Sequence, residues 1–388
     1  MVKKKAKKTA TRKKKTTKKV APRIRKDPLK EYAEAMGHGG IAEVTNLASD
    51  DAVSYVRDRC STQSLSLDRH LRSRNLDGIY QGRGGIPLGR VVEVYGPPFI
   101  GKSTILDHIL AAAQAMGGVG VLVDNEVSRD RYYTQCIGVD LAKLQLIEMK
   151  RATIEATMNR VMKSIDFWKT KYPEKPVVIG WDSLGKTSTE EELLKFEAEL
   201  DKPEFRDDGK GPKYQPGSAA RALHLVTRHL ASRLGGTRIG LVIINHEYEA
   251  IESRPSFFKK RNTYGGSALQ YTSSVRLELR FKEKGTIKST KGWPIGREIV
   301  VKLAKNRCGD GGEAVVPILN NLGISNLYTV FGELKRRGII VVSGNRHVIN
   351  LNGQELKFGG FEGLDAMCRE NPELWPLLLN VYETVMGA

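Results

Sequence analysis

The chain has 388 residues, which suggests two or three domains of roughly 150 residues each. Its 40% hydrophobic and 28% charged residues are typical of a globular protein. No apolar run reaches the roughly 20 residues that a membrane span needs, so we exclude a membrane-spanning protein. No apolar segment follows the basic N-terminus, so we also exclude a secretory signal. The four cysteines are too far apart for a zinc ribbon or a disulfide scaffold and fit a reducing compartment; they are Cys60, Cys136, Cys308 and Cys368.

The positive charge is concentrated at the N-terminus. Residues 1–27 hold eleven lysines, three arginines and one aspartate, so they carry +13 of the chain's net +19. This low-complexity segment has almost nothing to bury, and we expect a disordered tail. Such a tail can bind phosphates without reading a base sequence. A tail that only solubilises or localises the protein remains the alternative.

Further along the chain, strands and helices alternate. Residues 28–60 predict an N-terminal helical segment, with helices at Leu29–Met36 and Asp50–Arg59. Apolar strands are predicted at 90–95, 119–123, 177–181, 239–244, 275–281 and 299–303, and helices between them at 103–115, 154–171 and 218–234. This alternation predicts an α/β fold with a mainly parallel sheet flanked by helices.

After residue 319 the pattern changes to a helix at 327–337, a hairpin at 339–351 and helices at 363–370 and 374–386. We therefore expect a small α+β domain at the C-terminus. The predicted boundaries are 1–27 for the tail, 28–60 for the helical segment, 61–318 for the core and 319–388 for the C-terminal domain.

A phosphate-binding motif lies between the first strand of the core and its helix. The residues Gly96, Pro97, Pro98, Phe99, Ile100, Gly101, Lys102 and Ser103 match G-x-x-x-x-G-K-S/T. Glycines let the backbone wrap around phosphates, and a helix N-terminus adds N–H groups and a positive dipole end. We expect Lys102 to meet the β- and γ-phosphates, Ser103 to ligate Mg²⁺ and Thr104 to reach a phosphate oxygen.

Two carboxylates follow other predicted strands. Asp182 ends an apolar run, which is the Walker-B arrangement for a residue that holds Mg²⁺. Glu126 lies just past the strand at 119–123, at the edge where α/β proteins collect their site residues. Glu126 is a candidate to activate water, and a solvated loop residue is the alternative.

Together these motifs resemble the RecA family of strand-exchange proteins, from Ser61 nearly to the C-terminus. Residues 86–90 and the block from Asp124 to Asp140 are similar to bacterial RecA, whereas 181–185 and 244–249 look closer to phage UvsX-type recombinases. The resemblance implies a RecA-like P-loop NTPase core that uses ATP and Mg²⁺. It further implies that Glu126 activates water, Asp130 and Tyr133 contact adenine, and His246 senses the γ-phosphate.

The segment from Tyr248 to Thr263 mixes cations with aromatics, which suits a strand whose phosphates need neutralising and whose bases need stacking. A solvated loop with two chance aromatics is the alternative. The candidate DNA-binding residues here are Arg254, Phe257, Phe258, Lys259, Lys260 and Arg261. The resemblance adds Gly265 and Gly266, as donors of backbone N–H groups to a DNA phosphate. It also adds Arg221 and Arg228, which lie seven residues apart and hence on one face of a continuous helix.

Lys305-Asn306-Arg307 resembles the family's Lys-Asn-Lys, whose two cations reach the γ-phosphate of a neighbouring protomer. Arg307 keeps the charge but changes the geometry of its donors. Two segments depart from the family pattern: 71–84 looks like an insertion, and acidic residues between Glu190 and Asp208 precede the first DNA-binding loop.

The resemblance implies an ATP-dependent recombinase that forms helical filaments of itself on single-stranded DNA and pairs it with homologous duplex DNA. Single-strand-binding and mediator proteins are expected partners, and a bacterial or phage-infected cytoplasm is the expected location. A hexameric helicase and a non-enzymatic DNA-packaging protein are the alternatives.

Deleting residues 1–27 tests the role of the tail. The tail lacks aromatics and cannot favour single strands by stacking, so its loss is expected to weaken duplex binding and D-loop formation. ATPase activity on saturating single-stranded DNA should stay nearly intact. Fewer released counterions should also flatten the salt dependence of duplex affinity. An unchanged salt slope and D-loop yield would show that the tail only localises or solubilises the protein.

Overall fold

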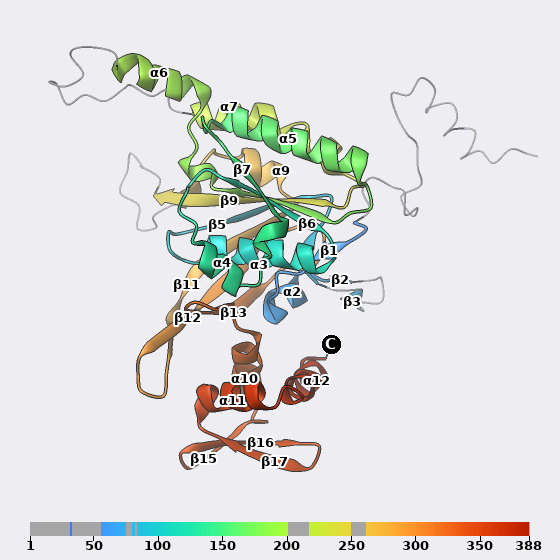
Figure 1. Ribbon diagram of the computed structural model, residues 1–388, viewed down its shortest axis with the longest axis vertical. Helices are drawn as coiled ribbons and strands as arrows, with labels where there is room; N and C mark the ends of the chain where they lie inside the picture. Colours follow the sequence, from blue (N-terminus) through green and yellow to red (C-terminus); the bar gives the residue numbers. More distant parts are fainter. Residues whose placement is uncertain are drawn as a thin grey trace, which may run out of the picture. The chain divides into compact units, whose positions relative to one another are not determined.

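The computed structural model describes residues 56–74, 80–81, 84–200, 217–249 and 261–387, together with Tyr32 (Figure 1). The chain divides into two units, Met1–Ala52 and Val53–Ala388, and all the described strands belong to the second unit. The predicted tail, the helix at 29–36 apart from Tyr32, and the residues Arg254, Phe257, Phe258, Lys259 and Lys260 lie outside the described residues.

A ten-stranded sheet forms the core, in the order β14-β13-β12-β11-β5-β9-β8-β6-β7, with β10 paired to β9. The parallel strands are β5 (Val91–Gly96), β6 (Val119–Asp124), β7 (Leu144–Glu148), β8 (Val177–Asp182), β9 (Ile239–Glu249) and β11 (Val275–Lys288). The antiparallel strands are β10 (Arg261–Thr263), β12 (Pro294–Asn306), β13 (Glu313–Leu319) and β14 (Gly323–Ile324). The predicted α/β class with a mainly parallel sheet is confirmed.

Helices cover both faces of the sheet, as Figure 1 shows for α3 and α5. On one face α3 (Lys102–Ala115) packs Ile105 and Ile109 into the same cluster as Val92 of β5. On the other face α5 (Ile154–Lys171) shares a cluster with α7 (Ser218–Thr227) and α8 (Leu230–Leu234). Alternate residues of a strand point to opposite faces, so β5 contributes Val91 to one cluster and Val92 to the other.

The remaining elements of the core are short. They are β1 (Arg59–Cys60), β4 (Ile86–Pro87), α2 (Leu65–His70), β2 (Ser73–Arg74), β3 (Tyr80–Gln81), α4 (Arg131–Cys136), α6 (Glu190–Leu200), α9 (Ala268–Thr272) and two 3-10 turns, η1 (Leu141–Lys143) and η2 (Leu184–Lys186). None of the helices in the described part of the chain is long and apolar enough to cross a membrane.

Two predicted helices are wrong in part. The described end of the predicted helix 50–59 is irregular at 56–58 and enters β1 at Arg59, where the guanidinium bonds Gly85 O at 3.2 Å and Ser73 Oγ at 2.5 Å. These tertiary bonds outweigh local helix propensity. The predicted helix 218–234 is interrupted at 228–229, where the Thr227 hydroxyl donates to the Leu223 carbonyl at 2.6 Å. Such back-bonding to the i−4 carbonyl bends helices.

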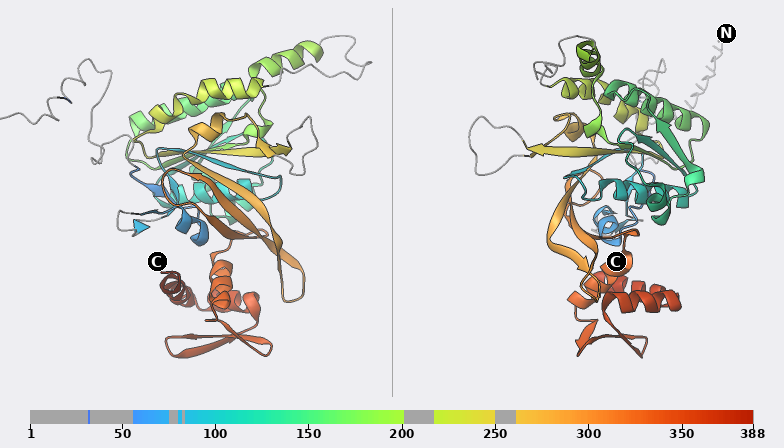
Figure 2. Two further views of the ribbon diagram at one scale, coloured as in Figure 1. Left: turned by 180° about the vertical axis from the view of Figure 1, so that it is seen from behind. Right: turned by 60° about the vertical axis from the view of Figure 1, so that its left-hand side comes forward.

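The C-terminal residues form their own hydrophobic cluster, which includes Val330, Leu334, Ile349, Leu364 and Leu378. Its elements are α10 (Asn326–Arg336), β15 (Val341–Ser343), β16 (Arg346–Leu351), β17 (Gln354–Phe358), α11 (Gly360–Glu370) and α12 (Leu374–Met386), at the red end of Figure 2. The predicted helices and hairpin are present, and β17 adds a third strand that the sequence did not predict. The boundary near residue 319 stays a prediction.

His108 of α3 ties three segments together. Its Nδ1 lies 2.7 Å from the Gln63 side-chain oxygen, and its Nε2 accepts the Ile324 N–H at 2.7 Å. The ring is 4% exposed, and burial lowers the pKa of His108 to about 4. Gly323 is required beside it, because a Cβ there would lie 2.4 Å from Nε2. A neutral imidazole therefore fastens the end of the core sheet to α3.

Replacing His108 with Gln should reduce the pH dependence of stability. The folded pKa lies below the ordinary 6.5, so protons favour the unfolded chain, and the stabilisation present above pH 6.5 is lost as the pH falls towards 4. Between pH 7 and pH 5 the titration of this group alone lowers the free energy of unfolding by about 2 kcal/mol. Urea unfolding at both pH values measures the effect. Parallel pH profiles for wild type and variant would contradict it.

Candidate active site

Four neighbouring parallel strands end at the same edge of the sheet. Gly96 of β5 pairs in register with His246 of β9, and Asp124 of β6 pairs with Asp182 of β8. Because β9 and β8 are neighbours, the ends of all four strands form one continuous row. The structure therefore brings together the predicted phosphate loop, metal ligand and sensor, with Glu126 two residues beyond β6.

The loop from Gly96 to Lys102 curls around the N-terminus of α3. Gly101, at the N-cap, has a φ of 102° and offers no side-chain cap, so the first N–H groups of a 14-residue helix are open to an anion. The Lys102 ammonium donates to the carbonyl oxygens of Gly96 at 3.0 Å and Pro97 at 2.8 Å. Burial lowers the pKa of Lys102, opposed by Asp182 and Glu126. These residues fit a polyphosphate.

The predicted loop residues differ in exposure. Phe99 lies at the tip with a φ of 59° and a side chain that is 99% exposed, whereas Ile100 is buried in the core. Gly96 also has a packing role, since a Cβ there would lie 2.5 Å from the Leu279 carbonyl oxygen. Pro98 is exposed beside Phe99. The side chains of Phe99 and Pro98 are thus exposed at the tip of the loop, and their contact with a nucleotide stays a prediction.

Asp182 is buried at the end of β8. Its Oδ2 accepts from Arg129 Nη2 at 2.8 Å, and its Oδ1 is buried with no hydrogen-bond partner among the described residues. Burial raises the pKa of Asp182, while Arg129 and the Ser103 hydroxyl oppose the shift. An unpartnered carboxylate oxygen near a serine hydroxyl fits a hard divalent cation. Mg²⁺ typically takes one or two such protein ligands and completes its shell with phosphate oxygens and water.

Glu126 faces into the site rather than into solvent, with its side chain 21% exposed. Its carboxylate lies 3.3 Å from Lys186 Nζ and 3.8 Å from His246 Nε2. The same His246 nitrogen is 3.1 Å from the Ser183 hydroxyl. Burial lowers the pKa of His246, and the charge of Lys102 lowers it further, whereas the Glu126 carboxylate opposes the shift. The arrangement can orient a carboxylate base beside the predicted sensor.

The two residues expected near adenine lie on the far side of the phosphate loop. Asp130 caps α4 by accepting the N–H groups of Tyr132 at 2.7 Å and Tyr133 at 3.0 Å. The Tyr133 hydroxyl lies 3.1 Å from Thr104 Oγ1, which connects α4 to the start of α3. Asp130 therefore has a structural function as a helix cap, and its predicted contact with a base stays a prediction.

The candidate DNA-binding residues divide into described and undescribed ones. β9 and β10 form an antiparallel pair, and the basic aromatic segment from Tyr248 to Thr263 includes the end of β9, the connection and β10. Of Arg261 only the backbone, in β10, is described. Gly265 and Gly266 have φ of 80° and 66°, and a Cβ on Gly265 would lie 2.0 Å from a methyl of Leu223. The two glycines are thus required by the close approach of this turn to α7.

Arg221 and Arg228 are both exposed, but they do not share one uninterrupted helix. Arg221 lies in α7, whereas Arg228 lies in the turn before α8. The expectation of one continuous helical face is therefore wrong. The acidic helix α6 nearby is partly neutralised, because Arg151 pairs with Glu190 and Glu197, each at 3.1 Å.

Lys305 and Arg307 lie away from the chain's own phosphate loop. Lys305 pairs in register with Arg276, and Arg276 with Glu93 in the middle of β5, whereas the loop begins at Gly96 where β5 ends. The Lys305 ammonium donates to the Gln270 carbonyl at 2.6 Å, and Arg307 is exposed. The structure does not bring either cation to the site of its own chain.

Sequence reasoning missed three residues of the site. Arg129 bridges Asp182 and Asp107, Lys186 pairs with Glu126, and Gly185 gives His246 its space, since a Cβ there would lie 2.5 Å from His246 Cδ2. Each partner is far away in the sequence, so no local pattern could show the pairing. The position of Lys186 four residues after Asp182 was the one available signal.

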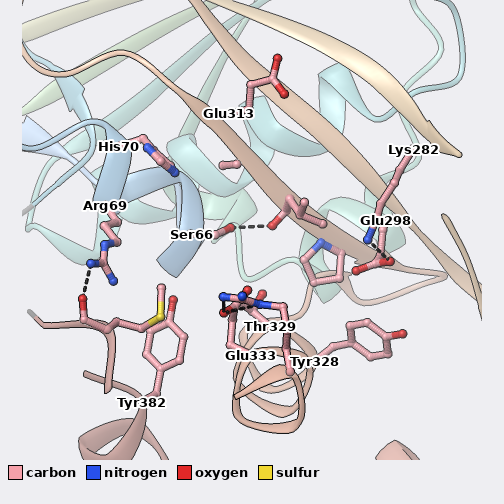
Figure 3. Close-up of a pocket in the computed structure, with 16 residues that line it drawn as sticks. Ser66, Arg69, His70, Lys282, Glu298, Glu313, Tyr328, Thr329, Glu333 and Tyr382 are labelled. Atoms are coloured by element: carbon pink, nitrogen blue, oxygen red, sulfur yellow. Dashed lines mark hydrogen bonds and ion pairs between the residues drawn. The ribbon is translucent and has the colours of Figure 1, made fainter. Parts of the chain in front are cut away.

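A second hollow, of about 390 Å³, lies between α2, β12, β13 and the C-terminal helices α10 and α12 (Figure 3). Two ion pairs line it, Lys282 with Glu298 at 2.7 Å and Arg336 with Glu333 at 2.5 Å. The Ser66 hydroxyl donates to the Val315 carbonyl at 2.7 Å, and Arg69 donates to Met386 O, while Arg69 Nη1 is buried with no hydrogen-bond partner among the described residues. These bonds connect α2 to β13 and to the end of α12.

Comparisons with known proteins find similarity to RecA proteins. The RecA N-terminal domain family matches residues 26–160. Protein RecA of Chlamydia trachomatis serovar L2 is 28% identical over 357 residues, covering 88% of this chain and 92% of the relative. Protein RecA of Fusobacterium nucleatum is 28% identical over 350 residues, covering 90% of this chain and 81% of the relative.

The pKa of His246 should respond to its two charged neighbours in opposite directions. Because the Lys102 cation lowers this pKa and the Glu126 carboxylate raises it, Lys102→Ala is expected to raise the pKa and Glu126→Gln to lower it. NMR titration of the histidine ring protons measures both, with His246→Gln to assign the signal. Shifts of the same sign in both variants would contradict the arrangement.

Proposed function

We propose that the chain is a RecA-family DNA recombinase, which hydrolyses ATP while polymerised on single-stranded DNA and exchanges strands with a homologous duplex. The observation that carries the proposal is that the ends of β5, β9, β8 and β6 lie side by side. The phosphate loop, Asp182 and His246 lie at these ends, Glu126 lies just beyond β6, and β9 continues into the hairpin of the proposed DNA-binding segment.

The hydrolytic part of the proposal uses residues that already lie together. Lys102 and the N-terminal N–H groups of α3 bind the phosphates, and Ser103 and Asp182 hold Mg²⁺. When bound, Mg²⁺ supplies positive charge that stabilises the developing charge on the phosphates. Glu126 accepts the proton of the attacking water, and Lys186 and His246 hold its carboxylate in place.

Coupling to DNA follows from the path of β9. His246 faces the nucleotide site, and its carbonyl accepts the Tyr264 N–H at 3.1 Å, directly before the Gly265-Gly266 turn. The buried Asn245 donates to the Tyr264 carbonyl at 3.0 Å and to Glu93 of β5 at 2.9 Å. A shift of β9 on nucleotide binding is therefore passed to both ends of the DNA-binding segment.

The positions of Lys305 and Arg307 support assembly into a filament. Lys305 at the end of β12 and Arg307 just after it are separated from β5 by β11, so they cannot serve the phosphate loop of their own chain, but they can complete the site of a neighbour. A cation supplied in this way stabilises the charge that develops during phosphoryl transfer. The comparisons give no support to the helicase or the packaging protein.

Mixed filaments test the proposal. Glu126→Gln should bind ATP and DNA but lose ATP turnover by at least about tenfold, since general base catalysis alone contributes roughly 10²–10⁴-fold. Lys305→Ala should lose DNA-stimulated turnover by at least about tenfold, because it removes the cation supplied to the neighbour. A mixture of the two should regain part of the ATPase activity, because some interfaces then pair an intact Glu126 with an intact Lys305.

The control is a mixture of Glu126→Gln with Lys102→Ala, two changes on the same side of an interface, which should stay inactive. If the first mixture also stays inactive in filaments shown by electron microscopy to be mixed, Lys305 does not act on a neighbour. If wild type shows neither DNA-stimulated ATPase nor D-loop formation, the proposed function is wrong.

A further inference from the structure

Arg129 joins two buried carboxylates from different elements. One Nη bonds Asp107 Oδ1 on α3, and the other bonds Asp182 Oδ2 at the end of β8 at 2.8 Å. The arginine side chain is 14% exposed, and those of Asp107 and Asp182 are 3% and 5% exposed. The Thr134 hydroxyl donates to Asp107 Oδ2 at 3.1 Å, so this anchor is itself held by α4.

The charges of this cluster do not balance. One guanidinium faces two carboxylates, which leaves a net charge of −1, and Asp182 Oδ1 is buried without a partner among the described residues. Burying a charge is costly unless it is paired, and so is burying an unbonded polar oxygen. Asp182 Oδ2 is therefore satisfied by Arg129, whereas Asp182 Oδ1 lacks a hydrogen-bond partner among the described residues.

The guanidinium is a planar, rigid fork, so fixing one nitrogen on Asp107 fixes the direction of the other. That second nitrogen donates a hydrogen bond to Oδ2 of Asp182. The carboxylate plane is thereby set, and Oδ1 is left as the oxygen available to a divalent cation. Partners that orient a ligating carboxylate in this way contribute strongly to metal affinity.

We propose that Arg129 is a positioning residue for the metal ligand Asp182, with Asp107 as its anchor. The proposal rests on the proposed function in that Mg²⁺ is taken to bind at Asp182 with a nucleotide. It also explains how the loop after β6 is held, because Arg129 lies three residues beyond Glu126 and fastens that loop to α3.

A competing role for Arg129 is simple repulsion of the cation, and the two roles predict opposite signs. If Arg129 only repels Mg²⁺, its removal makes the site more negative and tightens Mg²⁺ binding. If Arg129 orients Asp182, its removal weakens binding despite the added negative charge. The double variant Arg129→Gln/Asp107→Asn separates charge from orientation, because it removes one positive and one negative group and keeps the net charge of the cluster.

The experiment measures the Mg²⁺ concentration that half-saturates binding of a fluorescent ADP analogue, with the full-length protein and without DNA. For the double variant we expect this concentration to rise about tenfold or more. Nucleotide affinity in excess EDTA should stay within about twofold, since the phosphate loop is untouched. Arg129→Lys should be intermediate, because it keeps the charge and loses the fork.

Arg233→Gln is the matched control, since Arg233 pairs with Asp166 at an exposed position on other elements. It should leave the Mg²⁺ half-saturation unchanged. An unchanged or lower half-saturation in a folded double variant overturns the inference. A wild type that binds the analogue without any dependence on Mg²⁺ overturns the proposed function instead. If the double variant does not fold, Arg129→Lys, which keeps the charge of the cluster and loses the fork, is judged by the same criterion.

Discussion

The parallel register of β5, β9, β8 and β6 is the constraint on which the rest of the structure depends. Parallel strands point their carboxyl ends to one edge, and here four neighbours do so without interruption. A slip of one residue in β9 would turn His246 to the opposite face. The register is fixed by burial on both faces, because Val242 and Ile244 enter one hydrophobic cluster and Leu241 and Ile243 the other.

Buried charge is the second feature that organises the molecule. Glu93, fully buried in β5, accepts from Asn245 of β9 at 2.9 Å and from Arg276 of β11 at 2.5 Å, and the Arg276 guanidinium lies 4.5 Å from the centre of the Tyr95 ring. A buried ion pair of this kind adds little net stability, but breaking it is costly. It fixes the relative positions of β5, which leads into the phosphate loop, β9, which carries His246, and β11, which pairs with the strand of Lys305.

The candidate active site draws its residues both from core strands and from the loop that follows β6. Asp182 and His246 belong to strands that pack on both sides. Glu126 lies in a loop instead. Lys186, remote in sequence, pairs with its carboxylate, and Arg129 in the same loop bonds the more distant Asp107 and Asp182. The Asn125 side chain adds bonds to Thr157 and Thr187, at 3.1 and 3.0 Å. Hydrogen bonds and ion pairs to other elements therefore hold the loop after β6 in place.

The sequence alone determined the elements whose pattern is local. The apolar runs predicted the core strands, and the glycines and Lys102 predicted a phosphate loop, because the loop's own backbone and the following helix make that site. Tertiary structure decided whatever depends on a distant partner. It placed Arg59 in a strand, where its guanidinium bonds the Gly85 carbonyl, and it paired Arg129 with Asp107 and Asp182. Such pairings follow from the register of the sheet and the packing of α3 against it, and no local spacing in the sequence encodes them.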